Sequence, residues 1–271
     1  MKRLPHLLLT GALLPFIAGA NDIYVPDLNA PTTLAGAPVG SIWFTNRVVL
    51  NPTDQPLSYS YRARFGLNGP SPPPAGCDAE FFVPPGSSVP VSTPMSGSCI
   101  SPGVGVGFLQ LQLQSGLALS AAIELRELTG CGPESHTTVL TSGALPVYSS
   151  VFPAGSVAIT DGLLPPPPES DVPCMRGAGP DSRRVNVTIV NFGSDSTSAK
   201  VSVHGSNAAP LEVVVPPGHV RQLNDVFPDH IITALSVTAS QPFLCYASAV
   251  STFGDPLRPA SVATYRFRPS P

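Results

Sequence analysis

The chain has 271 residues, of which 24 are Gly and 34 are Pro, the two types that most often interrupt regular secondary structure. Long helices are therefore not expected. Charged residues make up 11% and hydrophobic residues 42%, which is enough apolar surface for a packed core and too much for a disordered tail. The net charge of -3 argues against nucleic acid as a partner, because proteins that bind it through general electrostatics carry a basic surplus.

Residues 1–20 have the form of a secretory signal peptide. Lys2 and Arg3 give a positive start, and residues 7–17 are almost entirely apolar. Ala-Gly-Ala then offers a small-x-small cleavage site before Asn21. The apolar run is shorter than the roughly 20 residues that a bilayer span needs. We therefore expect a protein exported to the periplasm or the extracellular space, with no membrane span in the mature chain.

Two parts of the remaining sequence resemble each other. Residues 42–53 and 184–193 are both β-rich runs that end in Asn followed by a turn residue. The next runs, 59–65 and 199–204, alternate with the period of two that is typical of half-buried strands. The sequence therefore predicts two copies of one β unit.

The tetrapeptide Val-Pro-Pro-Gly follows in both copies, at 83–86 and at 215–218. A strand that runs into it should end in a tight turn, because Pro fixes its own φ and Gly accepts a positive one. Two more strands then close each copy. They are predicted at 108–113 and 117–125 in the first copy, and at 234–238 and 243–250 in the second.

This pattern predicts an all-β protein with two antiparallel β-sandwich domains, at 21–144 and 181–271. A small β-barrel is the alternative fold. Residues 145–180 form a Pro-rich connector, in which four consecutive prolines favour a stiff polyproline II segment that spaces the two domains. A solvated, disordered linker is the alternative for this connector.

The five cysteines lack a C-x-x-C pair, and export would place them where disulfides persist. Cys77 and Cys99 lie in the two segments where the first copy is longer than the second, so we predict that they pair. Such a bond would be worth roughly 3 kcal/mol in the chain-entropy model. Cys131 and Cys174 flank the connector and are candidates for a second disulfide. Cys245 lies in an apolar strand and is expected to be a buried free thiol.

The order of these elements resembles tandem immunoglobulin-like repeats of large secreted proteins from environmental bacteria. In those repeats Trp-x-Thr-x-x-x-x-x-Asn-Pro opens each unit, as it does here from Trp43 to Pro52. The resemblance covers about residues 35–265, although the second copy lacks a counterpart of Trp43. It implies two immunoglobulin-like domains, and modules of this kind accompany secreted hydrolases or stand alone as surface proteins. It implies no functional residues.

Motifs of catalysis are not evident in the sequence. It contains no G-x-S-x-G or S-x-x-K arrangement and no His-x-His spacing. We therefore predict a non-enzymatic protein with no catalytic residues, cofactor or metal. Calcium is the alternative at one loop, where Asn224, Asp225 and Asp229 fall close together.

Tyr59 and Tyr61 are the candidate ligand-binding residues, because exposed aromatic rings on a sheet can stack against sugars. Alternation places them on one face of their strand, and Ser60 and Arg62 on the other, which should be solvated. Core packing of both tyrosines is the alternative. The predicted function is structural, adhesive or partner-binding at the cell surface or outside the cell, with a protein or glycan partner. The alternatives are a carbohydrate-binding module and an extracellular hydrolase with an unfamiliar site.

Overall fold

The computed structural model describes part of the chain, in ranges that cover both predicted copies. These ranges are residues 21–30, 41–66, 78–91, 105–128, 138–144, 147–161, 183–227, 232, 234–251, 261–262 and 264–268. Within these ranges the regular elements are all β-strands, and all strand pairs are antiparallel. The all-β prediction is therefore confirmed. The predicted signal peptide, the four consecutive prolines, Cys77, Cys99, Cys131 and Cys174 lie outside the described residues. None of the described residues belongs to a helix long and apolar enough to cross a membrane.

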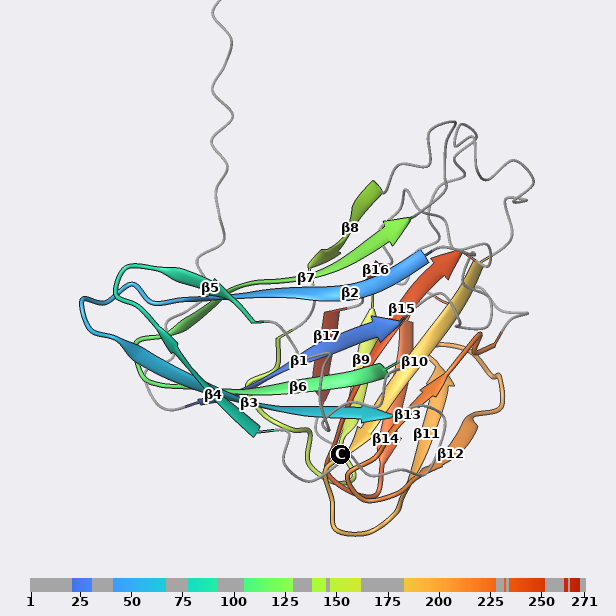
Figure 1. Cartoon of the computed structure of the whole chain (residues 1–271). Coiled ribbons are helices and arrows are strands. Elements are labelled where there is room, and N and C mark those ends of the chain that lie inside the picture. The colour runs from blue at the N-terminus through green and yellow to red at the C-terminus, as the bar shows by residue number, and fades with distance from the viewer. Residues whose placement is uncertain are drawn as a thin grey trace, which may run out of the picture.

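Eight strands form one sheet in the first half of the chain. They are β1 (Asn21–Ala30), β2 (Ser41–Leu50), β3 (Leu57–Gly66), β4 (Asp78–Val83), β5 (Ser88–Pro90), β6 (Gly105–Leu113), β7 (Ala118–Leu128) and β8 (Thr138–Ala144). Their order is β4-β3-β6-β1-β2-β7-β8, with β5 paired to β2. The pairing of β1 with β2 involves only Asn29 with Phe44 and Ala30 with Trp43. The sheet is therefore two four-stranded arrays, β4-β3-β6-β1 and β5-β2-β7-β8, joined at one corner (Figure 1).

The second half has two separate sheets. Their strands are β9 (Val157–Asp161), β10 (Arg183–Asn191), β11 (Thr197–Val203), β12 (Leu211–Val215), β13 (Val220–Leu223), β14 (Ala234–Ala239), β15 (Phe243–Ser251), β16 (Ser261–Val262) and β17 (Thr264–Arg268). One sheet has the order β13-β10-β15-β16 and the other β12-β11-β14-β9-β17. Apart from β17, the two sheets repeat the arrangement of the first half. The sheet β13-β10-β15-β16 corresponds to the array β5-β2-β7-β8, and β12-β11-β14-β9 corresponds to β4-β3-β6-β1.

Strand β9 differs from the prediction, because it lies within the range 145–180 that we expected to be a connector. It pairs with β14 and with β17, and so contributes to a sheet of the second half. Its side chains alternate between buried and half-buried positions from Val157 to Thr160. The strand has only five residues, and it lies in a Pro-rich range, so its short β pattern did not lead to the prediction of a strand.

A buried Asn fixes the Val-Pro-Pro-Gly turn in each half. Asn51 donates from Nδ2 to the carbonyls of Val83 (2.9 Å) and Gln55 (2.8 Å). In the second half, Asn191 donates in the same way to Val215 (2.8 Å) and Asp195 (2.7 Å). The glycines that end the two tetrapeptides have φ of 60° and 69°, which confirms the expected positive φ.

Candidate functional site

Residues 148–152 connect the two halves by backbone hydrogen bonds. The amide of Tyr148 donates to the carbonyl of Tyr24 in β1 (2.9 Å), and the amide of Tyr24 donates back (2.8 Å). Phe152 makes the same reciprocal pair with Phe243 at the start of β15 (2.9 and 3.0 Å). This short segment therefore joins a strand of the first half to a strand of the second.

Aromatic side chains fill the space around this segment. Phe108 of β6 contacts Tyr246 of β15, with ring centroids 5.5 Å apart, and Tyr148, at 5.8 Å. Tyr24 packs edge-on against Phe192 at 5.4 Å. We call these five residues and Phe152 the aromatic junction. Tyr24 and Phe108 belong to the same hydrophobic cluster as the core of the second half.

The halves are therefore packed against each other and are not spaced apart, contrary to the expectation drawn from the prolines. The physical reason lies in the neighbours of the junction residues. Val25 and Leu109 point into the core of the first half, so alternation turns Tyr24 and Phe108 to the opposite face of the sheet. Large aromatic rings on an outer face are stabilised when a second unit covers them.

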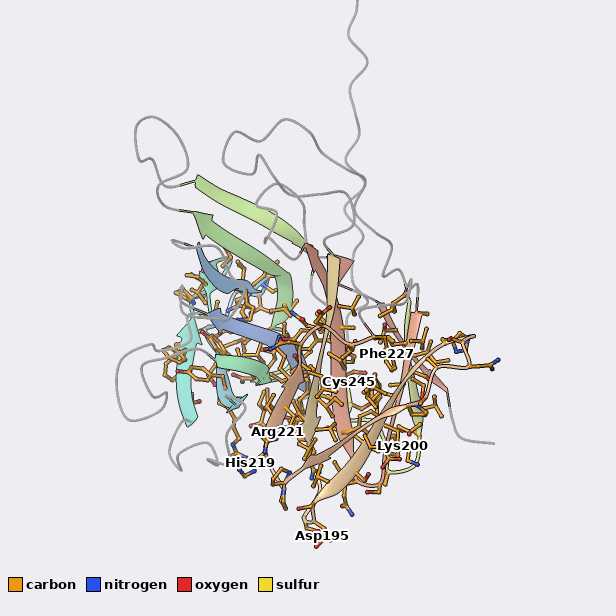
Figure 2. The ribbon with its side chains drawn as sticks, turned by 90° about the vertical axis from the view of Figure 1, so that its right-hand side faces the viewer. Asp195, Lys200, His219, Arg221, Phe227 and Cys245 are labelled. Atoms are coloured by element: carbon orange, nitrogen blue, oxygen red, sulfur yellow. The ribbon has the colours of Figure 1, made fainter. Side chains whose placement is uncertain are left out.

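The same outer face of the sheet becomes polar next to the aromatic junction. Strand register places Asp22 opposite Gln112, and Gln112 opposite Ser60. In the adjacent row Gln110 lies opposite Arg62. These five residues, with Tyr61, line a pocket of about 210 Å³, which we call the polar pocket. Strand β13 of the second half packs against β3 and β6, and Figure 2 shows its residue Arg221 on the side of the second half that faces these strands.

The polar pocket combines several hydrogen-bonding groups of different charge. Apart from Tyr61, whose ring is buried in the core of the first half, its lining has one carboxylate, one guanidinium, two primary amides and one hydroxyl. The Ser60 hydroxyl donates to Oε1 of Gln112 (3.4 Å), which links β3 to β6. Oδ1 of Asp22 is buried and makes no hydrogen bond among the described residues. The arrangement can hold a small polar molecule by hydrogen bonds.

Tyr59 and Tyr61 do not form an open face, since the side chain of each is only 3% exposed. They stack on Phe81 of β4, with centroids 5.5 and 5.6 Å from its ring, and belong to the core of the first half. Burial raises the pKa of Tyr59, and the nearby Arg47 guanidinium opposes this shift. The alternative of core packing therefore describes both residues, and they are not available to stack against a sugar.

The exposed aromatic side chains are the neighbours Phe81 and Phe82, which sequence reasoning missed. Phe81 is 40% exposed and Phe82 is 73% exposed. Phe82 lies opposite Ser58 and therefore shares the outer face with Ser60, which lines the polar pocket. The adjacent pair Phe-Phe was the available signal, because alternation must turn one of the two rings outward.

Cys245 is a free thiol within the second core, as predicted (Figure 2). Burial raises the pKa of this thiol well above its usual range. The hydroxyl of Tyr148 donates to the carbonyl of Cys245 (3.0 Å), and burial also raises the pKa of that hydroxyl. In the loop where calcium was the alternative to no metal, Asp225 has a φ of 51°, and its amide donates to Oδ1 of Asn186 (3.1 Å), while Asp229 lies outside the described residues. Among the described residues no three His, Cys, Asp or Glu side chains gather as a metal site.

Comparison with known proteins identifies no family. No family model matches the chain, and no curated protein matches it. One solved structure, an anti-sigma factor domain-containing protein, aligns over 92% of this chain and 100% of its own, with 10% identity and a TM-score of 0.12. Similarity at that level supports no conclusion about fold or function.

Proposed function

We propose that the protein is a secreted or cell-surface, non-enzymatic binding protein, made of two tandem immunoglobulin-like β-sandwich domains. The observation that carries the proposal is the aromatic junction, which packs two units of the same strand order into one body with a polar pocket beside it. A fixed pair of sheets suits a scaffold that presents a binding surface, because little conformational entropy is lost when a partner binds.

The chemistry of the polar pocket supports binding over turnover. Its amides, hydroxyl, guanidinium and single carboxylate form hydrogen bonds with a ligand. Hydrolysis of an ester, peptide or glycoside calls for a nucleophile with an adjacent base, or for two carboxylates on opposite sides of a bond. The groups around the pocket form neither arrangement.

Export and disulfides belong to the same proposal. The signal peptide over 1–20 would bring the chain to an oxidising compartment, where Cys77 can pair with Cys99 and where Cys131 and Cys174 can form a second bond. Intact mass of the exported protein, measured with and without reductant, tests this. We expect loss of residues 1–20 and a mass difference of two disulfides.

The binding role is tested with the exported, purified protein. One assay measures turnover of a panel of esters, peptides and glycosides, and a second measures retention on immobilised cell-envelope and matrix polymers. We expect retention without turnover. Hydrolysis of any substrate at an enzymatic rate would overturn the proposal, and so would a lack of retention on every polymer.

A further inference from the structure

We infer that the polar pocket binds a neutral carbohydrate, one sugar ring at a time. The inference rests on the proposed binding function and assigns its ligand class. It moves the carbohydrate site from Tyr59 and Tyr61, which are buried, to the opposite face of the same strand. The groups that would hold the sugar come from three neighbouring strands: Asp22 of β1, Gln110 and Gln112 of β6, and Ser60 and Arg62 of β3.

The mixture of groups matches the chemistry of sugar hydroxyls. Each hydroxyl both donates and accepts, and the amides of Gln110 and Gln112 also do both. Asp22 can only accept when it is ionised, and Arg62 can only donate. Because one negative and one positive side chain line the same small space, the pocket favours a ligand without net charge over an anion or a cation.

Asp22 gives a specific reason to expect a hydroxyl donor. Its Oδ1 is buried without a hydrogen-bond partner among the described residues. Buried acceptors without a donor are rare in folded proteins. Burial removes the acceptor's hydrogen bonds to water, and free energy is lost when no other donor replaces them. A sugar hydroxyl that enters the pocket beside Asp22 would supply the donor.

The size of the pocket agrees with a single ring. A pocket of about 210 Å³ is smaller than the roughly 300–1,000 Å³ that is typical for drug-sized ligands. Phe82 shares the outer face with Ser60, and lies diagonally across from it in the register of β3 and β4. Its exposed ring can pack against the apolar C–H face of the next sugar along a chain.

The test uses the exported protein and arrays of neutral oligosaccharides from β-glucans, α-glucans, xylans and mannans. The best-bound oligosaccharide is then titrated calorimetrically against wild type, Gln112→Ala and Asp22→Asn. Each variant should lose about tenfold or more in affinity, and Phe82→Ala should weaken binding of oligosaccharides more than of single sugars. The control is Gln55→Ala, an exposed Gln in a turn outside the pocket, which should change affinity less than twofold.

Salt dependence gives a second readout. Binding of a neutral sugar should change little between about 0.05 and 0.5 M salt, whereas a charged ligand would bind less tightly as salt screens its charge. Equal affinity of wild type, Gln112→Ala and Asp22→Asn would overturn the assignment of the pocket. Failure to bind any neutral oligosaccharide would overturn the carbohydrate inference, while the retention and turnover assays still decide the binding role separately.

Discussion

The substitution Asn191→Ala tests whether a buried Asn holds each Val-Pro-Pro-Gly turn. Asn191 has no exposed surface. Its Nδ2 donates to the carbonyls of Val215 and Asp195 (2.8 and 2.7 Å), and its Oδ1 accepts from the amide of Gly193 (2.8 Å). Ala removes all three bonds and leaves two carbonyls and one amide without their partner.

The expected loss follows from these three bonds. A net hydrogen bond is worth about 1 kcal/mol, and a buried group left without a partner costs about 1–3 kcal/mol. Since the two carbonyls and the amide lie near a turn, where water can reach part of them, we expect the free energy of unfolding to fall by about 2–4 kcal/mol. At roughly 2–4 °C per kcal/mol for a chain of this size, the midpoint of thermal unfolding should fall by roughly 5–15 °C.

The assay is thermal and urea unfolding followed by circular dichroism. Asn207→Ala is the matched control, because Asn207 is exposed in a loop, and it should stay within about 0.5 kcal/mol of wild type. Asn191→Asp should be at least as destabilising at neutral pH, since a buried carboxylate would face two carbonyl oxygens. Its stability should recover in part as the pH falls and the carboxyl becomes protonated. If the free energy of unfolding of Asn191→Ala lay within about 0.5 kcal/mol of the control, which is the usual range of surface substitutions, the reasoning would be refuted.

Three further predictions concern the aromatic junction and the second core. Phe108→Ala should lower the free energy of unfolding by about 3–5 kcal/mol in urea titrations, and Phe82→Ala by less than about 1 kcal/mol, because only Phe108 is buried; equal losses would contradict the junction. Cys245 should resist alkylation in the native protein and react once it is unfolded, as followed by peptide mass spectrometry; rapid labelling of the native state would contradict its burial. The raised pKa values of Cys245 and Tyr148 mean that stability is fully present below their unfolded pKa values, about 9.0 and 10.0, and is lost as pH rises above them. The loss should approach about 1.4 kcal/mol per pH unit for each group, and Tyr148→Phe should make the decline shallower; an unchanged slope in that variant would show that Tyr148 is not the titrating group.

Local patterns in the sequence predicted much of the strand structure. The alternation over residues 199–204 corresponds to alternating burial in β11 and the residue after it, and the Gly of each Val-Pro-Pro-Gly has the expected φ. Cys245 was placed correctly because its strand is apolar on both faces, which indicates burial on both sides. These features depend on a few neighbouring residues, so one sequence contains enough information to predict them.

The candidate site depends on long-range packing, and this is why Tyr59 and Tyr61 were assigned to a possible binding face. Alternation shows that they share one face of β3 but not whether another strand covers that face. The answer comes from the other array of the first half, because Val49 of β2 and Leu119 of β7 belong to the same buried cluster as both tyrosines, and Leu119 follows β3 by more than 50 residues in the chain. The pairing of β1 with β6 brings Asp22 next to Gln112, a neighbour relation that no local pattern contains.

The aromatic junction and the polar pocket are neighbouring parts of the same sheet face. Tyr24 and Asp22 are two positions apart on β1, and Phe108 and Gln110 are two positions apart on β6. Each strand therefore turns an aromatic residue and a polar residue to the same side. The aromatic residues attach the second half, and this attachment should hold the polar residues beside them in place. A function that needs the pocket thus needs the junction as well, so Phe108→Ala should weaken ligand binding even though Phe108 does not line the pocket.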